Sequence, residues 1–227
     1  MRMHAMILAA GRGERMRPLT DHTPKPLLTV GGKPLIVWHL ERLARAGFRQ
    51  VVVNHAWLGE QLVEQLGDGS AWGLRLIHSP EVRALETAGG IVQALAALGP
   101  APFLVINGDI WCDWDVRRAF TLADRLQALH APCACVLVNN PDHHPEGDFG
   151  LRGGRLVNEA PRLTFAGIGV YQPSLFAALQ AGKPAPLAPL LRAAMAQGLA
   201  LGEHHAGVWC DVGTVDRLTQ LRSQWGS

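Results

Sequence analysis

The chain has 227 residues, of which 48% are hydrophobic and 18% are charged, and its formal net charge is +2. A chain of this length and composition can bury a sizeable core in a single domain, and nothing in it suggests disorder. A net charge so close to zero argues against an extended nucleic-acid or anionic-membrane surface, so any cationic site should be local and its partners small anions. The first apolar run ends at Gly11 without the core of a signal peptide, and no run reaches the ~18 residues of a membrane span, so a cytoplasmic location is expected.

Strand-like and helix-like segments alternate along the first half of the chain. Short apolar or β-branched runs predict buried strands at residues 6–10, 50–54, 74–78 and 103–109. Apolar residues recur at helical spacing between these runs, which predicts helices at about 34–47, 57–66 and 85–98. Strands separated by such helices favour a mainly parallel sheet covered on both faces, in which ligands bind beyond the carboxyl ends of the strands.

The second half is less regular. After a predicted helix at about 115–129 and a strand at 133–138, residues 139–159 are rich in Gly, His, Asp and Pro and carry one short strand candidate, 149–151. This stretch predicts a substrate-facing hairpin or lid, in a region from about 139 to 171 that ends in a strand at 163–171. The remaining pattern predicts helices from 173 and at about 186–197, a strand and turn at 209–214, and a last helix capped by Thr214. The fold class is therefore α/β, a Rossmann-like three-layer α/β/α sandwich with a mostly parallel mixed sheet, in one domain spanning residues 1–227.

The loop after the first strand has the residue types of a phosphate-binding loop. Gly11 and Gly13 allow the backbone N–H groups to approach an anion, and four cations follow or flank them: Arg12, Arg15, Arg17 and Lys25. The loop lacks both the dinucleotide-binding and the P-loop signatures, and the alternative is an ordinary glycine turn with solvated arginines. Prolines on both sides of Lys25 fix the backbone there, which suits an ammonium group directed at a triphosphate.

Two carboxylates, Asp109 and Asp211, each follow a short apolar run and precede a small or glycine-containing turn. Alone, each would be interpreted as a turn or helix cap. As a pair beside a phosphate loop they predict a magnesium site, because this hard cation takes few protein oxygens together with phosphate oxygens and water.

The other potential metal ligands are interpreted as structural. Asp113 and Asp115 precede a predicted helix, and the four cysteines lack zinc-site spacing. Adjacent histidines such as His143 and His144 point apart on a strand and are expected at the surface or in the lid.

Three motifs together resemble the sugar-1-phosphate nucleotidyltransferase (NDP-sugar pyrophosphorylase) family over essentially the whole chain. They are the opening loop with its Pro-Lys-Pro, the Asn-Gly-Asp at 107–109, and the Trp-x-Asp-Val-Gly-Thr at 209–214. Segments 54–59, 85–90 and 143–149 are similar to a short branch of the family that acts on N-acetylmuramate 1-phosphate. Ala88 departs from that branch, which has a glycine there. With 227 residues, the chain is not expected to carry the C-terminal β-helix of bifunctional relatives.

The resemblance implies transfer of a uridylyl group from UTP to N-acetylmuramate 1-phosphate, with Mg²⁺ as cofactor, in peptidoglycan (cell-wall) recycling. Because a phosphate monoester is largely dianionic at neutral pH, the reaction needs no general base. A mannose- or glucose-type 1-phosphate guanylyl- or thymidylyltransferase is the first alternative. The second is a non-catalytic nucleotide-binding subunit, which would have no need for Arg15, Lys25, Asp109 and Asp211 together.

The resemblance also implies roles for individual residues. Arg15 would act on the triphosphate tail, Lys25 would bridge the nucleotide and sugar phosphates, and Asp109 with Asp211 would hold the metal. The nucleotide would be bound by Gly11, Arg12, Gly13, Arg15, Lys25, Asn54, Gly90 and Asn107. The sugar, under the 139–171 lid, would be bound by Asp148, Gly150, Glu159 and Ile168. Arg83 and Arg152 are both open candidates for contact with a lactyl carboxylate.

Overall fold

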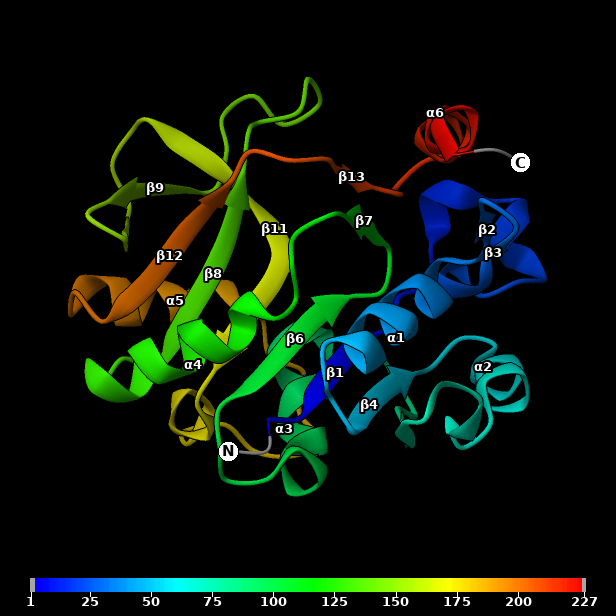
Figure 1. Cartoon of the computed structure of the whole chain (residues 1–227), viewed down its shortest axis with the longest axis horizontal. Helices are drawn as coiled ribbons and strands as arrows, with labels where there is room; N and C mark the ends of the chain where they lie inside the picture. Colours follow the sequence, from blue (N-terminus) through cyan, green and yellow to red (C-terminus); the bar gives the residue numbers. More distant parts are fainter. Residues whose placement is uncertain (1–2, 226–227) are drawn as a thin grey trace.

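A computed structural model describes residues 3–225 and contains one nine-stranded mixed sheet (Figure 1). Across the sheet the strands are β5 (Arg75–Pro80), β4 (Gln50–His55), β1 (Ala5–Leu8), β6 (Phe103–Asn107), β11 (Arg162–Tyr171), β8 (Cys133–Val138), β12 (Ala200–His205), β10 (Arg155–Val157) and β9 (Phe149–Arg152). Only β10 and β11 run against the direction of the other strands. The predicted α/β class with a mostly parallel mixed sheet is confirmed.

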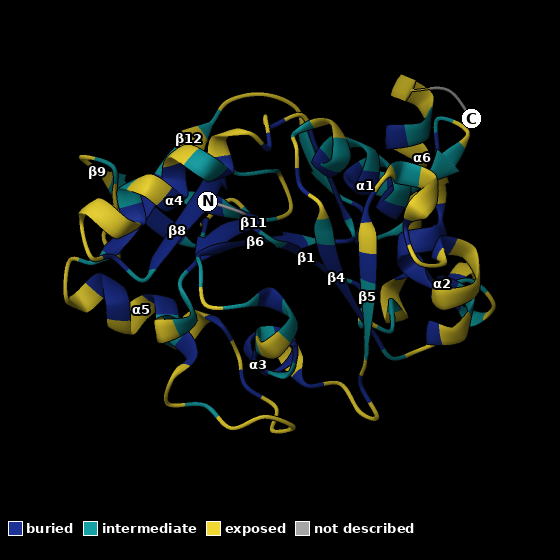
Figure 2. Ribbon diagram, turned by 60° about the horizontal axis from the view of Figure 1, so that its bottom comes forward, coloured by how far each residue is buried: buried dark blue, intermediate teal, exposed yellow. Residues whose placement is uncertain are grey.

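Helices cover both faces of this sheet, as the sequence predicts. They are α1 (Leu35–Arg45), α2 (Gly59–Leu66), α3 (Glu86–Leu98), α4 (Arg118–Ala128), α5 (Ala188–Ala196) and α6 (Val215–Trp225). Successive strand residues point to opposite faces, so Ile7 packs in the core under α1 and α4, whereas Met6 packs in the core under α3 and α5. Figure 2 shows α4 and α1 on one side of the buried strands and α3 and α5 on the other.

Three segments in the second half of the chain differ from the prediction. The segment 200–205, for which no strand is predicted, is strand β12 and pairs in parallel with β8; its polar second half hides the strand pattern. β10 is also unpredicted and forms a hairpin with β9 inside the predicted lid region. The helix expected from 173 is only a 3-10 turn, Pro173–Phe176.

A small antiparallel ribbon lies beyond the C-terminal edge of β6. It joins β7 (Ile110–Cys112) to β13 (Trp209–Asp211), with Asp211 opposite Ile110. The N–H of Val212 also donates to the carbonyl of Asp109 at 2.8 Å. The ribbon therefore brings together two segments that are about 100 residues apart in the sequence.

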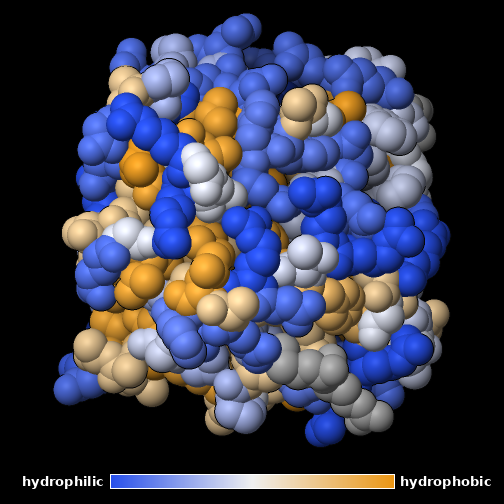
Figure 3. All heavy atoms as spheres, turned by 60° about the vertical axis from the view of Figure 1, so that its left-hand side comes forward, coloured by the Kyte–Doolittle hydropathy of each residue, from blue (hydrophilic) through white to orange (hydrophobic). Residues whose placement is uncertain are grey.

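The last helix packs on the phosphate-loop region. Leu218 and Leu221 of α6 share a separate small core with Met16 of the loop and with the hairpin of β2 (Thr29–Val30) and β3 (Lys33–Pro34). Figure 1 shows α6 beside this hairpin. On the face that carries β9 and β12, apolar side chains form several patches separated by hydrophilic ones (Figure 3). Among residues 3–225, no helix combines the length and the apolar character needed to cross a bilayer.

Two side chains of α1 anchor β7 and the residues that follow it. His39 is buried, and its Nε2–H donates to the carbonyl of Ile110 at 3.0 Å. The Arg42 guanidinium donates to the carbonyls of Cys112 and Trp114. Burial, reinforced by the nearby Arg42 charge, lowers the pKa of His39 to about 4.

His39 makes the stability of the fold depend on pH. Its pKa is about 4 in the folded protein and about 6.5 in an unfolded chain, so between these values only the unfolded state takes up the proton. Stability is therefore retained above about pH 6.5 and lost as the pH falls. The variant His39→Gln keeps a donor for Ile110 and does not titrate. Between pH 7 and pH 5, we expect wild type to lose about 2 kcal/mol more unfolding free energy than the variant, measured by urea denaturation. Equal losses in the two proteins would contradict this assignment.

Candidate active site

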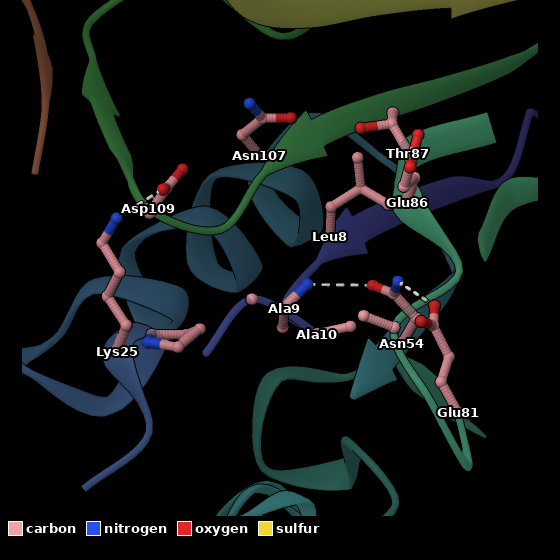
Figure 4. A pocket seen from close by; sticks show the side chains of 13 residues that line it. Leu8, Ala9, Ala10, Lys25, Asn54, Glu81, Glu86, Thr87, Asn107 and Asp109 are labelled. Atoms are coloured by element: carbon pink, nitrogen blue, oxygen red, sulfur yellow. Dashed lines mark hydrogen bonds and ion pairs between the residues drawn. The ribbon is translucent and has the colours of Figure 1, made fainter. Parts of the chain in front are cut away.

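A cleft opens at the carboxyl ends of β1, β4 and β6, where the sequence places the ligand (Figure 4). This central cleft has a volume of about 230 Å³ and is lined by Leu8, Ala9, Ala10, Gly11, Lys25, Pro26, Asn54, Glu81, Ala84, Glu86, Thr87, Asn107 and Asp109. Two further cavities share lining residues with it. The loop recess, about 200 Å³, is lined by Gly11, Gly13, Glu14, Arg15, Lys25, Asp109 and Gly213. The apolar chamber, about 520 Å³, is lined by Glu86, Thr87, Asn107, Asp148, Phe149, Phe165, Pro186, Leu187, Ala188 and Leu191.

A lysine–aspartate ion pair stands where the cleft meets the loop recess. Lys25 begins a 3-10 turn, Lys25–Leu27, that the flanking prolines fix, and the residue is only 8% exposed. Its Nζ lies 2.5 Å from Oδ2 of Asp109, which follows β6. Because a buried ammonium needs a partner, Asp109 holds the lysine charge at the mouth of both cavities.

The glycine loop directs only some of its cations toward this site. Arg15 lines the loop recess and forms no ion pair within residues 3–225. Arg12 instead donates to Thr20 O at 2.9 Å and to Asp21 at 3.2 Å, and its guanidinium lies 3.8 Å from the Trp57 ring centroid. The predicted nucleotide-binding residue Arg12 is therefore engaged within the loop and lines none of the three cavities.

The two predicted metal ligands lie on adjoining backbone segments, and Asp109 lines the central cleft and the loop recess, whereas Asp211 lines none of the three cavities. The ribbon places Asp211 beside Asp109, and Oδ1 of Asp211 accepts a bond from Nη1 of Arg217 at 2.9 Å. Oδ1 of Asp109 and Oδ2 of Asp211 carry no hydrogen bond in the part of the chain that the structure describes. Each of these two residues therefore has one carboxylate oxygen without a hydrogen bond, which is the kind of donor that a hard divalent cation takes.

A second group of potential ligands comprises Cys112, Asp113 and His205. Burial raises the pKa of the Cys112 thiol to about 11, so it is protonated at neutral pH. His205 Nε2 lies 2.6 Å from Asp113 Oδ1, and this contact links the end of β12 to the residue that follows β7. None of these residues lines the three cavities, and the predicted structural interpretation of Asp113 fits this placement.

A buried polar network forms the other end of the central cleft. Asn54 accepts a bond from the N–H of Ala9 at 2.8 Å and donates to Oε1 of Glu81 at 2.7 Å. Oε2 of Glu81 accepts the N–H of Leu85 at 2.9 Å, and Glu81 is only 6% exposed. Figure 4 shows this network opposite the Lys25–Asp109 pair. A side chain at Gly90 would lie 2.6 Å from Oε1 of Glu81, so Gly90 makes room for the network and does not line the cleft.

Sequence reasoning missed Glu81. The residue comes directly after Pro80, at the end of β5, so it is a carboxylate at a strand end like Asp109. That position is the signal that could have identified it.

The structure separates the four residues predicted to bind sugar. Asp148 lines the apolar chamber, where its Oδ2 accepts the N–H of Phe165 at 2.8 Å. Gly150 lies inside β9, Glu159 is exposed, and Ile168 is 2% exposed in the core opposite Ile106. None of these three lines the chamber.

The chamber walls are instead mostly apolar residues that the sequence analysis did not single out, among them Phe149, Phe165 and Leu187. Asn107, predicted to bind nucleotide, lies between the cleft and the chamber. Arg83 donates to the carbonyl of Gly182, and neither Arg83 nor Arg152 lines the chamber.

The sheet is mostly parallel, a glycine loop follows its first strand, and carboxylates lie at the strand ends. This combination is typical of α/β enzymes that act on nucleotides. The chain belongs to the nucleotidyl transferase family, whose pattern matches residues 4–152. The resemblance noted in the sequence is thereby confirmed.

Relatives match over almost the full length. An N-acetylmuramate alpha-1-phosphate uridylyltransferase of Neisseria meningitidis serogroup B is 54% identical, and the match covers 99% of each chain. A protein of the same name from Caulobacter vibrioides is 36% identical over 92% of this chain and 91% of its own. A crystal structure assigned to a glucose-1-phosphate thymidylyltransferase of Bacillus anthracis superposes with a TM-score of 0.86 at 21% identity, covering 98% of this chain and 95% of its own. That structural likeness shows the shared fold.

The two glycines of the loop should respond differently to alanine. Gly13 has φ +70°, and a Cβ there would lie 3.0 Å from Cγ2 of Thr20, whereas a Cβ at Gly11 meets nothing within 4 Å. Gly13→Ala should therefore lower the unfolding free energy by about 1–2 kcal/mol, while Gly11→Ala should change it by less than about 0.5 kcal/mol. Urea denaturation of both variants checks this, and equal effects would contradict it.

Proposed function

We propose that the protein transfers the uridylyl group of UTP to N-acetylmuramate 1-phosphate, giving UDP-N-acetylmuramate and pyrophosphate. The observation that carries this proposal is the 54% identity, over 99% of both chains, to a relative with that name. The proposal includes a role in peptidoglycan recycling and, because the reaction consumes UTP, a cytoplasmic location.

The three cavities, which share lining residues, can hold the three parts of the reactants. The triphosphate would lie at the loop recess, where Arg15 and Lys25 supply positive charge and the loop supplies backbone N–H groups. The base would lie at the Asn54–Glu81 end of the cleft, and the sugar would occupy the apolar chamber. Asn107 lies between cleft and chamber, where the two substrates would meet.

The chemistry needs positioning and charge neutralisation more than acid–base groups. An oxygen of the sugar phosphate forms a bond to the α-phosphorus of UTP, and the bond from that phosphorus to the bridging oxygen of the β-phosphate breaks, so pyrophosphate leaves. The attacking monoester has a second pKa of about 6 and is largely dianionic at neutral pH. Lys25, held by Asp109, lies where it can neutralise charge on the reacting phosphates.

Asp109 and Asp211 are the residues that would hold Mg²⁺. The fit rests on their adjacency across the β7–β13 ribbon and on the free oxygen of each carboxylate. When bound, the ion would neutralise phosphate charge in the transition state.

The apolar chamber suits an N-acetylated sugar with a lactyl side chain. Phe149, Phe165 and Leu187 offer apolar surface for the methyl groups of such a sugar. No lining residue of the chamber is basic, and Asp148 and Glu86 are acidic. The lactyl carboxylate is therefore expected to point out of the chamber, because inside it would face like charges.

Glu81 can discriminate between the bases of different nucleoside triphosphates. A carboxylate only accepts hydrogen bonds, so it can pair with the ring N–H of uracil, thymine or guanine but repels the acceptor nitrogen of cytosine or adenine. This feature keeps a thymidylyl- or guanylyltransferase as the alternative, and the full-length relatives favour UTP.

Pyrophosphate release from a matrix of nucleoside triphosphates and sugar 1-phosphates, with Mg²⁺, tests the proposed function. The expected result is turnover with UTP and N-acetylmuramate 1-phosphate. Asp109→Ala and Lys25→Ala should each lower kcat/KM by at least ~10²-fold, comparable to the loss of one key charge-stabilising group. Lys33→Ala, which removes a lysine paired with Glu41 outside the cavities, is the matched control. Near-normal rates in either site variant would refute the assignment.

The role of Glu81 has a separate test. In Glu81→Gln the side chain gains an N–H₂ donor, so the ratio of kcat/KM for CTP to that for UTP should rise by at least ~10-fold. Glu86→Gln, a second acidic residue of the same cleft, should leave this ratio within about twofold of wild type. An equal loss with both nucleotides in Glu81→Gln would mean that Glu81 only supports the loop at Leu85.

A further inference from the structure

Asp211 is held by side chains from two other parts of the chain. Arg217, in the first turns of α6, donates from Nη1 to Oδ1 of Asp211 at 2.9 Å. Nε2 of His143, from the loop between β8 and β9, lies 3.1 Å from the same oxygen and also contacts Arg217 Nη1. Both side chains contact Asp211 through Oδ1, which leaves Oδ2 without a hydrogen bond within residues 3–225.

The local structure keeps Arg217 in place. Thr214 caps α6 by accepting the N–H of Arg217 at 3.3 Å, as the sequence predicts. A Cβ on Gly213 would lie 2.2 Å from Nη2 of Arg217, so only glycine leaves room for the guanidinium there. The Arg217 side chain is 14% exposed, and its Nε is buried without a partner in the described chain. The side chain is thus enclosed beside the loop recess, which Gly213 lines.

A carboxylate that binds a metal works best when its orientation is fixed before the metal arrives. Hydrogen bonds to ligating carboxylates supply that orientation, and losing them typically costs about 10–100-fold in metal affinity or activity. Arg217 has the geometry for this task, because it engages one oxygen of Asp211 and leaves the other free. A guanidinium also donates in a rigid plane and stays charged at any physiological pH.

We propose that Arg217 is a positioning residue that orients Asp211 toward the divalent cation, so that the coupling between metal and nucleotide binding depends on it. The proposal rests on the proposed function, in which Asp211 holds Mg²⁺ beside the triphosphate. Arg217 itself touches neither the metal nor the reacting atoms; it acts through Asp211.

Calorimetry without sugar phosphate tests this, because no turnover then occurs. The dissociation constant of UTP is measured with excess Mg²⁺ and again with EDTA, and the ratio of the two values is the metal–nucleotide coupling. In Arg217→Ala we expect this coupling to fall by at least ~10-fold, with the value in EDTA changed by less than about twofold. Arg217→Lys, which keeps the charge but loses the planar donor, should retain part of the coupling and serves as the readout if the alanine variant does not fold.

Arg222→Ala is the matched control, since Arg222 lies on the same helix and donates to Thr29 O outside the site. It should leave the coupling unchanged. Wild-type coupling in both Arg217 variants, or an equal loss in Arg222→Ala, would overturn the proposal. The measurement is made with UTP, or with whichever of GTP and TTP the wild type turns over. A wrong base or sugar in the proposed function therefore shows in the substrate matrix, whereas a wrong role for Arg217 shows in the coupling.

Discussion

The pairing of β7 with β13 holds the two halves of the candidate site together. β7 follows the carboxylate that ends the β6 segment, and β13 ends in the second carboxylate, so the antiparallel register fixes their separation through backbone hydrogen bonds. His39 and Arg42 of α1 anchor β7 from the other side. Without this ribbon, Asp109 and Asp211 would belong to unconnected loops, and neither would define a site by itself.

Charge is balanced in pairs around this ribbon before any ligand is present. Asp109 holds Lys25, and Asp211 holds Arg217. The side chains of Lys25 and Arg217 are mostly buried, and a buried charge without a partner would strongly destabilise the fold. The pairs therefore keep cationic and anionic groups at fixed positions where phosphates would arrive, which is the preorganisation that phosphate chemistry needs.

Segments near the beginning and the end of the described chain pack together beside the candidate site. The glycine loop follows the first strand, and α6 ends the described chain, yet both pack in one small core with the β2–β3 hairpin. His143, in the loop between β8 and β9, contacts Asp211. The candidate site is thus assembled from the first strand, the middle of the sheet, the loop between β8 and β9, and the last helix.

The sequence by itself determined the features that depend on local chemistry. The strand–loop–helix order, the proline-fixed Lys25, the Thr214 cap and the carboxylates at strand ends could all be predicted, because each follows from neighbouring residues. Tertiary structure alone decided the rest. Arg12 lies over the Trp57 ring, Ile168 packs in the core opposite Ile106, and Glu81 accepts a hydrogen bond from Asn54. Each of these contacts depends on a segment that is distant in the sequence. A side chain's partner is set by the packing of those segments, and no pattern within its own segment records it.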